Sequence, residues 1–592
     1  MFQRYFISLP PKIKNNPSVS YLWQYDEPTP PLLHAADELA LQTGISPLVA
    51  RLLLQRGVDS AEAVKAYFHP SLQALADPFL MQDMDKAVKR LNAAMGNKER
   101  VLIYGDYDVD GCTAVALVHR FLSQYYSHID YYIPDRYEEG YGLSRRGIDY
   151  AHSTGVSLVI ILDCGIKAVD EIAYAKSLGI DFIICDHHVP GPELPPAAAI
   201  LNPKRADETY PFREFSGCGV GFKFMQAFAL SNAIPFAQLI PLLELVAVSI
   251  AADIVPIMGE NRILAYHGLR QLTQNPGTGM RAVIELCQLT GREITMADII
   301  FKIGPRINAS GRMLNGKVSV ELLIERNYAH AAVLARQINT YNEERKELDK
   351  RMTEEACALV NDMEDLANRK AIVIYNESWH KGVIGIVALR LTETFCRPAV
   401  VLTRSGDIVT GSVRSTGDFD IYAAIQHCKD LLLNFGGHTY AAGLSMSVDQ
   451  VEAFSERFEQ YVATHIHAAQ ATPTLRIDAV IPFSQLTRKL QNELRHMRPY
   501  GPENQEPIFA TKQVYDYGTS KVVGRTQEHI KLELVEATSP AVVSGIAFQQ
   551  SRHARYIKSK RAFDITYSVE DNLHKRGEMQ LLIHDIRTPE QP

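Results

Sequence analysis

Three aspartates alternate along the chain directly after a short apolar run. Residues 101–104 are Val-Leu-Ile-Tyr, and they are followed by Gly105, Asp106, Asp108, Asp110 and Gly111. We predict a buried strand that ends in a turn, because glycines punctuate such breaks. Open α/β sheets bind ligands at the carboxyl ends of their strands. In an extended backbone the three carboxylates would point the same way, and their repulsion would call for a cation such as Mg²⁺ or Mn²⁺.

A calcium loop or an acidic surface turn is the alternative for this stretch. An EF-hand loop also alternates aspartates, but it needs a glutamate at its twelfth position and flanking helices. Counting from Asp106, the twelfth residue is Leu117, and a strand precedes the loop. Residues elsewhere in the chain must therefore decide between the alternatives.

Two further predicted strands end in the same kinds of side chain. Residues 158–162 run into Asp163, and residues 181–185 run into Asp186, His187 and His188. From about residue 80 to 270 strands alternate with helices, which favours a parallel sheet with helices on both faces. Three polar strand ends at one edge of a sheet are hard to explain structurally, so we predict one site there.

Asp253 is a fourth candidate, within the apolar sequence Ala-Ala-Asp-Ile-Val-Pro of residues 251–256. A carboxylate in such a setting is costly unless it is paired or bound to a metal, although a helix cap or a buried salt bridge would also explain it. The combined set has four carboxylates and one imidazole, enough for two divalent ions that share a carboxylate and promote phosphoryl transfer. Its members are Asp106, Asp108, Asp163, His187 and Asp253.

The middle of the chain holds candidate anion-binding groups. Residues 302–312 are rich in Gly, Asn, Ser and Arg, which suits either a phosphate-holding loop or a solvated turn. A long helix over about 329–362 follows, and we expect it to connect two lobes. The second α/β lobe carries glycine-rich stretches at 411–415 and 435–439, where Arg414 and His438 could contact an anion.

Residues from about 474 to 592 form short β-rich runs, which favour a small barrel such as an OB-fold. Basic residues at 552–561 surround Tyr556, a combination that suits single-stranded nucleic acid or, alternatively, a plain solvated loop. The first 75 residues carry no recognisable chemistry, and we expect a docking or interaction role for them.

Composition sets outer limits on these interpretations. The 592 residues carry a net charge of −7 and are 46% hydrophobic, which fits about three or four globular domains without a global basic field. The longest apolar stretch, 239–257, contains Glu244, Asp253 and two prolines, so we expect it to be buried and expect no membrane partner. The eight cysteines form no CxxC pair, which indicates reduced thiols and a cytoplasmic protein.

The motifs, in this order, resemble those of the DHH phosphoesterase superfamily. They are Gly-Asp-Tyr-Asp-Val-Asp-Gly, Leu-Asp-Cys-Gly, Cys-Asp-His-His and Ala-Asp-Ile-Val-Pro, and Gly436-Gly-His438 resembles the hallmark of the DHHA1 companion lobe. The stretches 306–312, 379–388, 498–504 and 581–587 narrow the resemblance to the RecJ family of single-stranded-DNA-specific exonucleases.

The resemblance implies an α/β fold with five parts. These are an N-terminal helical or extended segment (1–75), a DHH domain with a parallel sheet (76–325), a connector helix (326–367), a DHHA1 domain (368–470) and an OB-fold nucleic-acid-binding barrel (471–592).

The resemblance also implies 5′→3′ removal of nucleotides from single-stranded DNA with two Mn²⁺ or Mg²⁺ ions, in recombination, repair and mismatch repair. The metal ligands would be the five residues of the combined set, His188 would face the scissile phosphate or leaving group, and Asp186 would orient an imidazole. A single-strand-binding protein and a helicase would be partners. The substrate contacts would be Arg306, Asn308, Arg312, Ser412, Arg414, Gly436, Gly437 and His438.

Two rival functions stay open at this point. One is a phosphodiesterase of the same superfamily that acts on oligonucleotides or cyclic dinucleotides, and the other is an inactive DHH scaffold. The sequence also departs from some relatives at Tyr104, where they carry a metal-binding histidine, so that water would complete one coordination sphere.

Overall fold

The computed structural model describes residues 21–363, 365–467, 474–537, 539–572 and 578–589. The chain forms two compact units, which we describe separately. One unit, which we call the DHH unit, comprises His69–Glu347 with Pro499–Asn504. The other comprises Met1–Phe68, Leu348–Arg498 and Gln505–Pro592.

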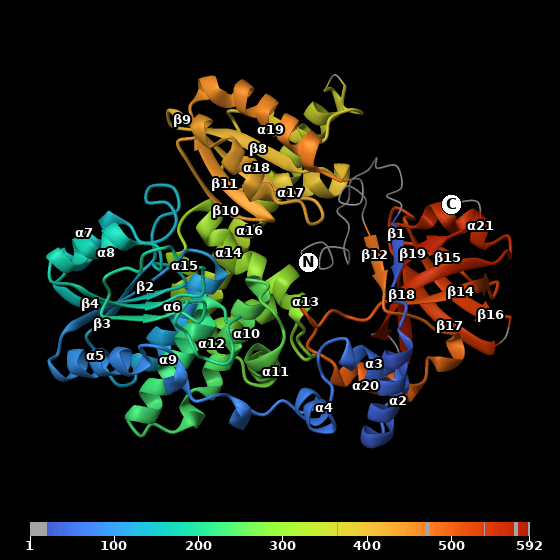
Figure 1. Ribbon diagram of the computed structural model, residues 1–592, viewed down its shortest axis with the longest axis horizontal. Coiled ribbons are helices and arrows are strands. Elements are labelled where there is room, and N and C mark those ends of the chain that lie inside the picture. The colour runs from blue at the N-terminus through green and yellow to red at the C-terminus, as the bar shows by residue number, and fades with distance from the viewer. Residues whose placement is uncertain (1–20, 364, 468–473, 538, 573–577, 590–592) are drawn as a thin grey trace. The chain divides into compact units, whose positions relative to one another are not determined.

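The DHH unit contains a five-stranded parallel sheet in the order β3-β2-β4-β5-β6 (Figure 1). The predicted parallel sheet is confirmed, and its three predicted strands are β2, β4 and β5. The five strands are β2 (Arg100–Gly105), β3 (Ile129–Tyr132), β4 (Val156–Leu162), β5 (Asp181–Cys185) and β6 (Ala199–Leu201).

Helices cover both faces of this sheet because alternate strand residues point in opposite directions. Ile103 and Ile160 pack on one face with helices α5 (Met84–Gly96), α6 (Val109–Leu122) and α9 (Gly217–Ser231). Tyr104 and Ile161 pack on the other, with α7 (Arg145–Ser153) and α8 (Val169–Ser177). Burial of each such side chain stabilises the fold by about 1.5–3 kcal/mol.

The turn between β2 and α6 differs from the predicted extended backbone. Helix α6 begins at Val109, within the aspartate motif, and Asp108 caps it by accepting a hydrogen bond from Gly111 N at 3.0 Å. The turn is tight, since a Cβ on Gly111 would lie 2.3 Å from the Asp106 carbonyl oxygen. The predicted extended backbone is therefore wrong, and the aspartates meet because the chain turns sharply into α6.

A group of helices completes the DHH unit. The predicted loop at 302–312 is also wrong, since a π-helical turn (Ile299–Ile303) leads directly into α14 (Gly304–Met313). Gly311 lets α14 approach the aspartate turn, because a Cβ there would lie 2.5 Å from the Tyr107 carbonyl oxygen. The other helices are α10 (Leu243–Ala252), α11 (Gly259–Gln274), α12 (Thr278–Leu286), α13 (Met296–Asp298) and α15 (Lys317–Ile324).

The predicted long helix is α16 (Tyr328–Asn361), whose N-terminal half packs in the core of the DHH unit and whose C-terminal half packs in the second α/β lobe. That lobe has a sheet in the order β10-β11-β9-β8-β7, of which only the β7–β8 pair is parallel. Its elements are β7 (Ile372–Tyr375), α17 (Ile384–Phe395), β8 (Ala399–Ser405), β9 (Ile408–Arg414), α18 (Ile421–His427), β10 (Asn434–His438), β11 (Ala441–Met446) and α19 (Val451–His465).

The C-terminal part is the predicted barrel. Five strands close on themselves, because β14 pairs with both β18 and β16 in the ring β14-β16-β17-β19-β18. The elements are β12 (Thr474–Ile477), β13 (Ala479–Val480), α20 (Arg488–His496), β14 (Phe509–Asp516), β15 (Lys521–Val523), β16 (His529–Glu536), β17 (Ser539–Ala547), α21 (Ala554–Ile557), β18 (Phe563–Asp571) and β19 (Met579–Arg587).

The N-terminal segment is built into this barrel domain. Strand β1 (Leu22–Tyr25) pairs in parallel with β12 (Figure 1). Trp23 of β1 donates its indole N–H to Asp585 at 2.8 Å. Helices α2 (Pro30–Thr43), α3 (Pro47–Leu54) and α4 (Ala61–Phe68) follow. Ser46, which caps α3, contacts the Glu493 carboxylate of α20. The segment therefore helps to form the barrel domain's core.

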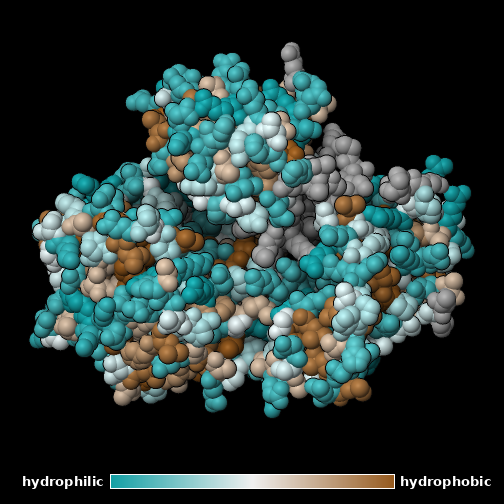
Figure 2. Space-filling model, in the orientation of Figure 1, coloured by the Kyte–Doolittle hydropathy of each residue, from teal (hydrophilic) through white to brown (hydrophobic). Residues whose placement is uncertain are grey.

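Hydrophilic residues predominate on the face shown in Figure 2, and hydrophobic residues occur there in separate patches. Among the described residues, no helix combines the length and the apolar character needed to cross a bilayer.

Candidate metal centre and active site

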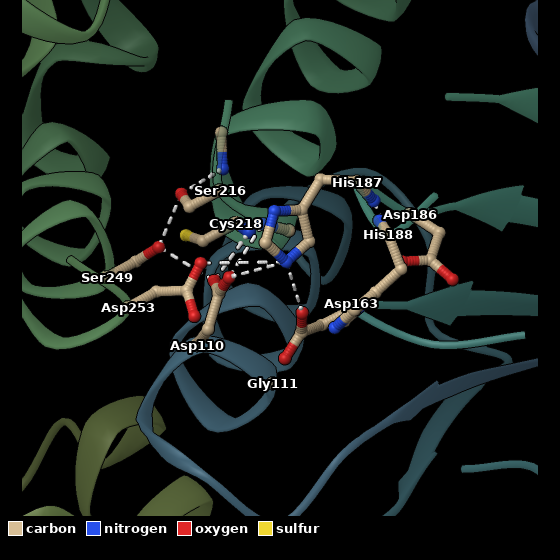
Figure 3. Close-up of polar contacts among 12 residues, drawn as sticks. Asp110, Gly111, Asp163, Asp186, His187, His188, Ser216, Cys218, Ser249 and Asp253 are labelled. Atoms are coloured by element: carbon tan, nitrogen blue, oxygen red, sulfur yellow. Dashed lines mark hydrogen bonds and ion pairs between the residues drawn. The ribbon is translucent and has the colours of Figure 1, made fainter. Parts of the chain in front are cut away.

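Three carboxylates surround one imidazole nitrogen in the DHH unit (Figure 3). Nε2 of His187 lies 3.1 Å from Asp163 Oδ1, 3.6 Å from Asp253 Oδ2 and 3.8 Å from Asp110 Oδ2. Asp163 follows β4, His187 follows β5 and Asp253 ends α10, so residues far apart in sequence meet at one edge of the sheet. The structure therefore brings the predicted strand ends together.

Buried atoms without partners show that this cluster fits a metal. Neither ring nitrogen of His187, nor Oδ1 of Asp106, hydrogen-bonds to any described residue, although all three atoms are buried. Leaving such a group unpaired costs about 1–3 kcal/mol. Divalent cations accept carboxylate oxygens and imidazole nitrogens as ligands, and Mn²⁺ and Mg²⁺ suit an oxygen-rich set.

The electrostatics of the cluster favour a bound cation as well. Burial raises the pKa of Asp163 well above its usual value, and the charges of Asp110, Asp108, Asp253 and Asp106 raise it further. Burial and neighbouring carboxylates likewise raise the pKa of Asp106, Asp108 and Asp253. A cation between the carboxylates would remove this mutual repulsion. The predicted ligands Asp106, Asp108 and Asp253 thus lie close enough to Asp163 to affect its ionisation, and His187 contacts Asp163 directly.

Asp110 is a member of this cluster that was absent from the predicted ligand set. Its carboxylate accepts hydrogen bonds from the backbone N–H groups of Gly217, at 2.6 Å, and Cys218, at 2.8 Å, at the start of α9. The hydroxyl oxygen of Ser249 lies 2.7 Å from Asp110 Oδ1 and 2.6 Å from Ser216 Oγ (Figure 3). The helix N-terminus and these hydroxyls fix the Asp110 carboxylate beside His187.

Asp163 has a strained backbone, as residues at functional sites often do. Its φ is 61°, in the left-handed region. Gly217 approaches it so closely that a Cβ on the glycine would lie 2.6 Å from Asp163 Cβ. The start of α9 therefore supports two carboxylates of the cluster at once.

Asp186 holds the His188 ring beside the cluster. Its buried carboxylate accepts from the backbone N–H groups of Ile166, His187 and His188, and Nδ1 of His188 lies 2.7 Å from Oδ1. Burial opposes ionisation of Asp186, but the hydrogen bond and charge of His188 outweigh it and lower its pKa to about 2. Burial lowers the pKa of His188, and the hydrogen bond and charge of Asp186 reverse this and raise it to about 9.

Tyr141 and Arg136 also lie at this site, although the sequence interpretation did not single them out. The Tyr141 side chain is 58% exposed, and its hydroxyl lies 3.3 Å from both the Asp163 carbonyl oxygen and His188 Nε2. It stands between Gly140 and Gly142, both with positive φ. Burial raises the pKa of Asp106, and the charge of Arg136 offsets part of that rise. The Gly-Tyr-Gly sequence of residues 140–142 was the sequence feature that could have indicated a functional role for Tyr141.

Tyr104 lies in the core and not in the cluster. Its hydroxyl donates to the Gly142 carbonyl oxygen at 2.9 Å, and its ring stacks on Tyr132 with centroids 5.4 Å apart. Burial raises the pKa of the phenol. Tyr104 is therefore part of the core on the α7–α8 face of the sheet.

Three predicted substrate contacts lie on α14. Arg306 donates to Asn339 Oδ1 at 3.0 Å and to the Lys302 carbonyl oxygen at 2.8 Å, so its guanidinium joins α14 to α16. Asn308 is half-buried on the same helix, and Arg312 accepts a hydrogen bond from the Tyr137 hydroxyl at its backbone carbonyl. Their contact with a substrate stays a prediction.

The other predicted substrate contacts lie in the second α/β lobe. Ser412 and Arg414 are on β9, where Arg414 Nη1 donates to Ser412 Oγ at 3.0 Å. A Cβ on Gly385 would lie 2.9 Å from Ser412 Oγ and 3.0 Å from Arg414 Nη2, so both side chains cover the start of α17. The neighbouring strand β10 carries Gly436, Gly437 and His438, which stay predicted contacts.

Comparison with known proteins matches three stretches of the chain to family models. The DHH family N-terminal domain matches residues 100–250, the DHHA1 domain matches 368–464 and the RecJ OB domain matches 477–585.

A relative with a curated name decides the family. The single-stranded-DNA-specific exonuclease RecJ of Escherichia coli is 32% identical over 570 residues, which cover 93% of this chain and 97% of the relative. The chain belongs to the RecJ family. RecJ of Bacillus subtilis is 35% identical over 522 residues, 87% of this chain, but the match spans only 64% of that longer protein.

A solved RecJ structure shares the fold. The crystal structure of RecJ in complex with Mn²⁺ from Thermus thermophilus superimposes with a TM-score of 0.82 at 25% identity, over 96% of this chain and 80% of that one. The predicted RecJ resemblance and the predicted architecture of DHH domain, DHHA1 domain and OB-fold barrel are confirmed.

Proposed function

We propose that this chain is a metal-dependent exonuclease that removes nucleotides from single-stranded DNA in the 5′→3′ direction. The observation that carries the proposal is the buried His187 imidazole, whose nitrogens lack hydrogen bonds to the described residues while three carboxylates face Nε2. The RecJ relatives named above share this substrate class.

Two Mn²⁺ or Mg²⁺ ions would be held by the five predicted ligands together with Asp110. When bound, they would lower the pKa of a water molecule and stabilise negative charge on the phosphoryl oxygens. The Thermus thermophilus relative was crystallised with Mn²⁺. The hydroxyls and backbone N–H groups around Asp110 keep that carboxylate in place whether or not it bears a ligand role.

His188 would act on the scissile phosphate or the leaving oxygen. Asp186 keeps the ring charged at neutral pH and fixes its orientation through Nδ1, which leaves Nε2 directed to the neighbourhood of Tyr141. An imidazolium beside the carboxylates can donate a proton or a charge-assisted hydrogen bond to an anionic oxygen. The exposed Tyr141 ring offers a face on which a nucleotide can stack.

The second α/β lobe would contact the DNA phosphates. Ser412 and Arg414 lie together at the start of a helix, a location that favours anions because its N–H groups are unpaired and its dipole is positive. Gly436 and Gly437 allow close approach of the backbone, and His438 can add a hydrogen bond. Recognition of a 5′ phosphate there would set the direction of digestion.

The barrel would hold the strand during successive cleavage. Arg555, Lys558 and Lys560 are exposed around α21, and the Arg561 guanidinium lies 6.0 Å from the Tyr556 ring centroid. Deleting the region from residue 474 onward would be a poor test, because it removes the partner of β1 and the 499–504 segment of the DHH unit. The double variant Arg555→Glu/Lys558→Glu is better, with Lys350→Glu on α16 as the exposed control.

We expect the double variant to bind single-stranded DNA more weakly, with a shallower salt dependence, and to release it after fewer cleavages. Cleavage of a dinucleotide should not change. If the double variant is as processive as the wild type, Arg555 and Lys558 do not hold the DNA strand during successive cleavage.

The direct test of function compares products from 5′-labelled and 3′-labelled single strands with Mn²⁺, using Asp163→Ala as the inactive control. We expect mononucleotides released from the 5′ end first. Hydrolysis of dinucleotides or cyclic dinucleotides in preference to long strands would favour the phosphodiesterase alternative. Absence of any metal-dependent cleavage would favour the inactive scaffold.

A single-strand-binding protein and a helicase are the partners that we propose, since a 5′ single strand must be generated and kept free of duplex. We also propose action in the cytoplasm. All eight cysteines lie in the described ranges and are free thiols, as a reducing compartment would keep them.

A further inference from the structure

A short segment of the barrel domain's sequence folds as part of the DHH unit. Residues 499–504 lie between α20 and β14, both of which belong to the other unit. These residues nevertheless pack with the DHH unit. We call these six residues, Pro-Tyr-Gly-Pro-Glu-Asn, the clasp. Peptide bonds join them on both sides to the barrel domain.

The clasp is a closed turn held by Asn504. Gly501 and Asn504 exchange backbone hydrogen bonds, each of 3.0 Å, and the Asn504 side chain donates from Nδ2 to the Pro499 carbonyl oxygen at 2.8 Å. Asn504 is fully buried. Prolines at 499 and 502 restrict the backbone further, so this turn is well ordered before anything contacts it.

The clasp is hydrogen-bonded to the loop that follows Asp253 and to the start of α11. Ile257 donates its backbone N–H to the Pro502 carbonyl oxygen at 2.8 Å, and the buried Arg262 reaches the Pro499 carbonyl oxygen at 3.4 Å. The loop links α10, which ends in Asp253, to α11. The clasp therefore holds the connection four residues from a carboxylate that faces His187 (Figure 3).

This loop needs external support because its backbone is strained. Ile254, next to Asp253, has a φ of 59°, which a β-branched residue adopts at a cost of about 1–3 kcal/mol. Such a conformation persists only where surrounding contacts enforce it. Asn261 supplies one such contact by donating to the Pro256 carbonyl oxygen at 3.0 Å. The Pro502 carbonyl oxygen supplies a second one by accepting the N–H of the following residue, Ile257.

We propose that the clasp is a positioning element for Asp253, so that metal affinity in the DHH unit depends on a segment carried by the barrel domain. The inference rests on the proposed role of Asp253 as a metal ligand. Loss of the clasp lets Ile254 relax, which moves the Asp253 carboxylate away from His187. Residues that orient a ligand from behind commonly change metal affinity or activity by about 10–100-fold.

Asn504→Asp in the full chain is the sharpest test. It keeps the shape of the side chain and replaces the donor to the Pro499 carbonyl oxygen with a second acceptor. The matched control is Asn492→Asp, the same change at an exposed position on α20. Mn²⁺ binding to the DNA-free protein is titrated by electron paramagnetic resonance, and hydrogen exchange is followed on the peptide that contains Ile257.

We expect Asn504→Asp to weaken Mn²⁺ binding about tenfold and to speed exchange at Ile257. Its kcat should fall at limiting Mn²⁺ and recover with added Mn²⁺, while its KM for single-stranded DNA stays constant. Pro502→Ala, which keeps the carbonyl but replaces the ring with a methyl group and a backbone N–H, is a milder variant for use if Asn504→Asp does not fold. It should shift both readouts in the same direction.

Mn²⁺ affinity within twofold of wild type in the folded clasp variants would overturn the inference. Asp253→Asn separates this outcome from failure of the proposed metal site. If Asp253→Asn also leaves Mn²⁺ affinity unchanged, Asp253 is not a ligand. If Asp253→Asn abolishes binding while the clasp variants do not change it, only the clasp inference fails.

Discussion

Nδ1 of His188 lies 2.7 Å from Oδ1 of Asp186, within a carboxylate that also accepts three backbone N–H groups. This contact keeps a positively charged ring beside an acidic cluster and fixes which nitrogen faces outward. The adjacent residues His187 and His188 thereby receive different roles, one facing the carboxylates and the other held by Asp186.

Asp186→Asn should lower kcat on single-stranded DNA by about 10–100-fold. The amide of the Asp186→Asn variant cannot stabilise the charged His188 ring. Its NH₂ group would also face the backbone N–H groups whose hydrogen bonds the Asp186 carboxylate accepts. Asp170→Asn, at an exposed position on α8, is the control. In a double-mutant cycle, combination with His188→Ala should add little further loss. Full additivity of the two losses would show that Asp186 does not act through His188.

Asp163→Asn should raise the melting temperature of the metal-free protein while abolishing its stabilisation by Mn²⁺. Removing one buried charge relieves the repulsion that raises the pKa of these aspartates. Each kcal/mol of relief corresponds to about 2–4 °C. Asparagine tolerates the positive φ of this position. Scanning calorimetry with and without Mn²⁺ measures both effects, and a lower melting temperature without metal would contradict the repulsion argument.

Gly217→Ala should disrupt the metal centre, because the new Cβ would lie 2.6 Å from Asp163 Cβ. Overpacking of this kind costs about 1–3 kcal/mol, and here it displaces a carboxylate of the cluster. We expect weaker Mn²⁺ binding by titration and a matching loss of nuclease activity. Gly96→Ala is the control, since a Cβ there meets nothing within 4 Å. Equal behaviour of the two variants would exclude a role for the close approach of α9.

The barrel domain should lose stability as the pH falls from about 6.5 to about 4. Burial, with the Arg552 charge, lowers the pKa of His553 from 6.5 to about 4, and Arg552 Nε donates to its Nε2 at 3.0 Å, so the folded state holds a neutral ring. The unfolded chain binds the proton first, so protonation favours unfolding in this window. At about 1.4 kcal/mol per pKa unit the loss approaches about 3 kcal/mol.

Hydrogen exchange in the barrel strands across this pH range measures that loss, after correction for the intrinsic pH dependence of exchange. The variant His553→Gln should show a flatter dependence on pH because it has no proton to bind. If the stability of the variant falls with pH as steeply as that of the wild type, a group other than His553 is responsible for the loss.

The sequence predicted the strands and the convergence of Asp163, His187 and Asp253 because each ends an apolar segment, a local pattern. It grouped Asp110 with Asp106 and Asp108 but left it out of the ligand set, since the groups that hold its carboxylate come from α9 and α10, far along the chain. Gly311 made 302–312 resemble a loop, whereas the glycine serves the packing of α14 on Tyr107. Local composition cannot reveal a requirement that arises from tertiary contact.

The pairing of β1 with β12 has a consequence for synthesis. Trp23 of β1 and Asp585 of β19, which form a hydrogen bond, are 562 residues apart. A ribosome working at about 5–20 residues per second needs on the order of half a minute to two minutes to make the intervening chain. Trp23 therefore lacks its hydrogen-bond partner for that time, while the strands of the DHH sheet, which ends at Leu201, have already been synthesised. Residues 69–347 of the DHH unit, which carry the proposed metal ligands, are thus synthesised before the barrel and residues 499–504.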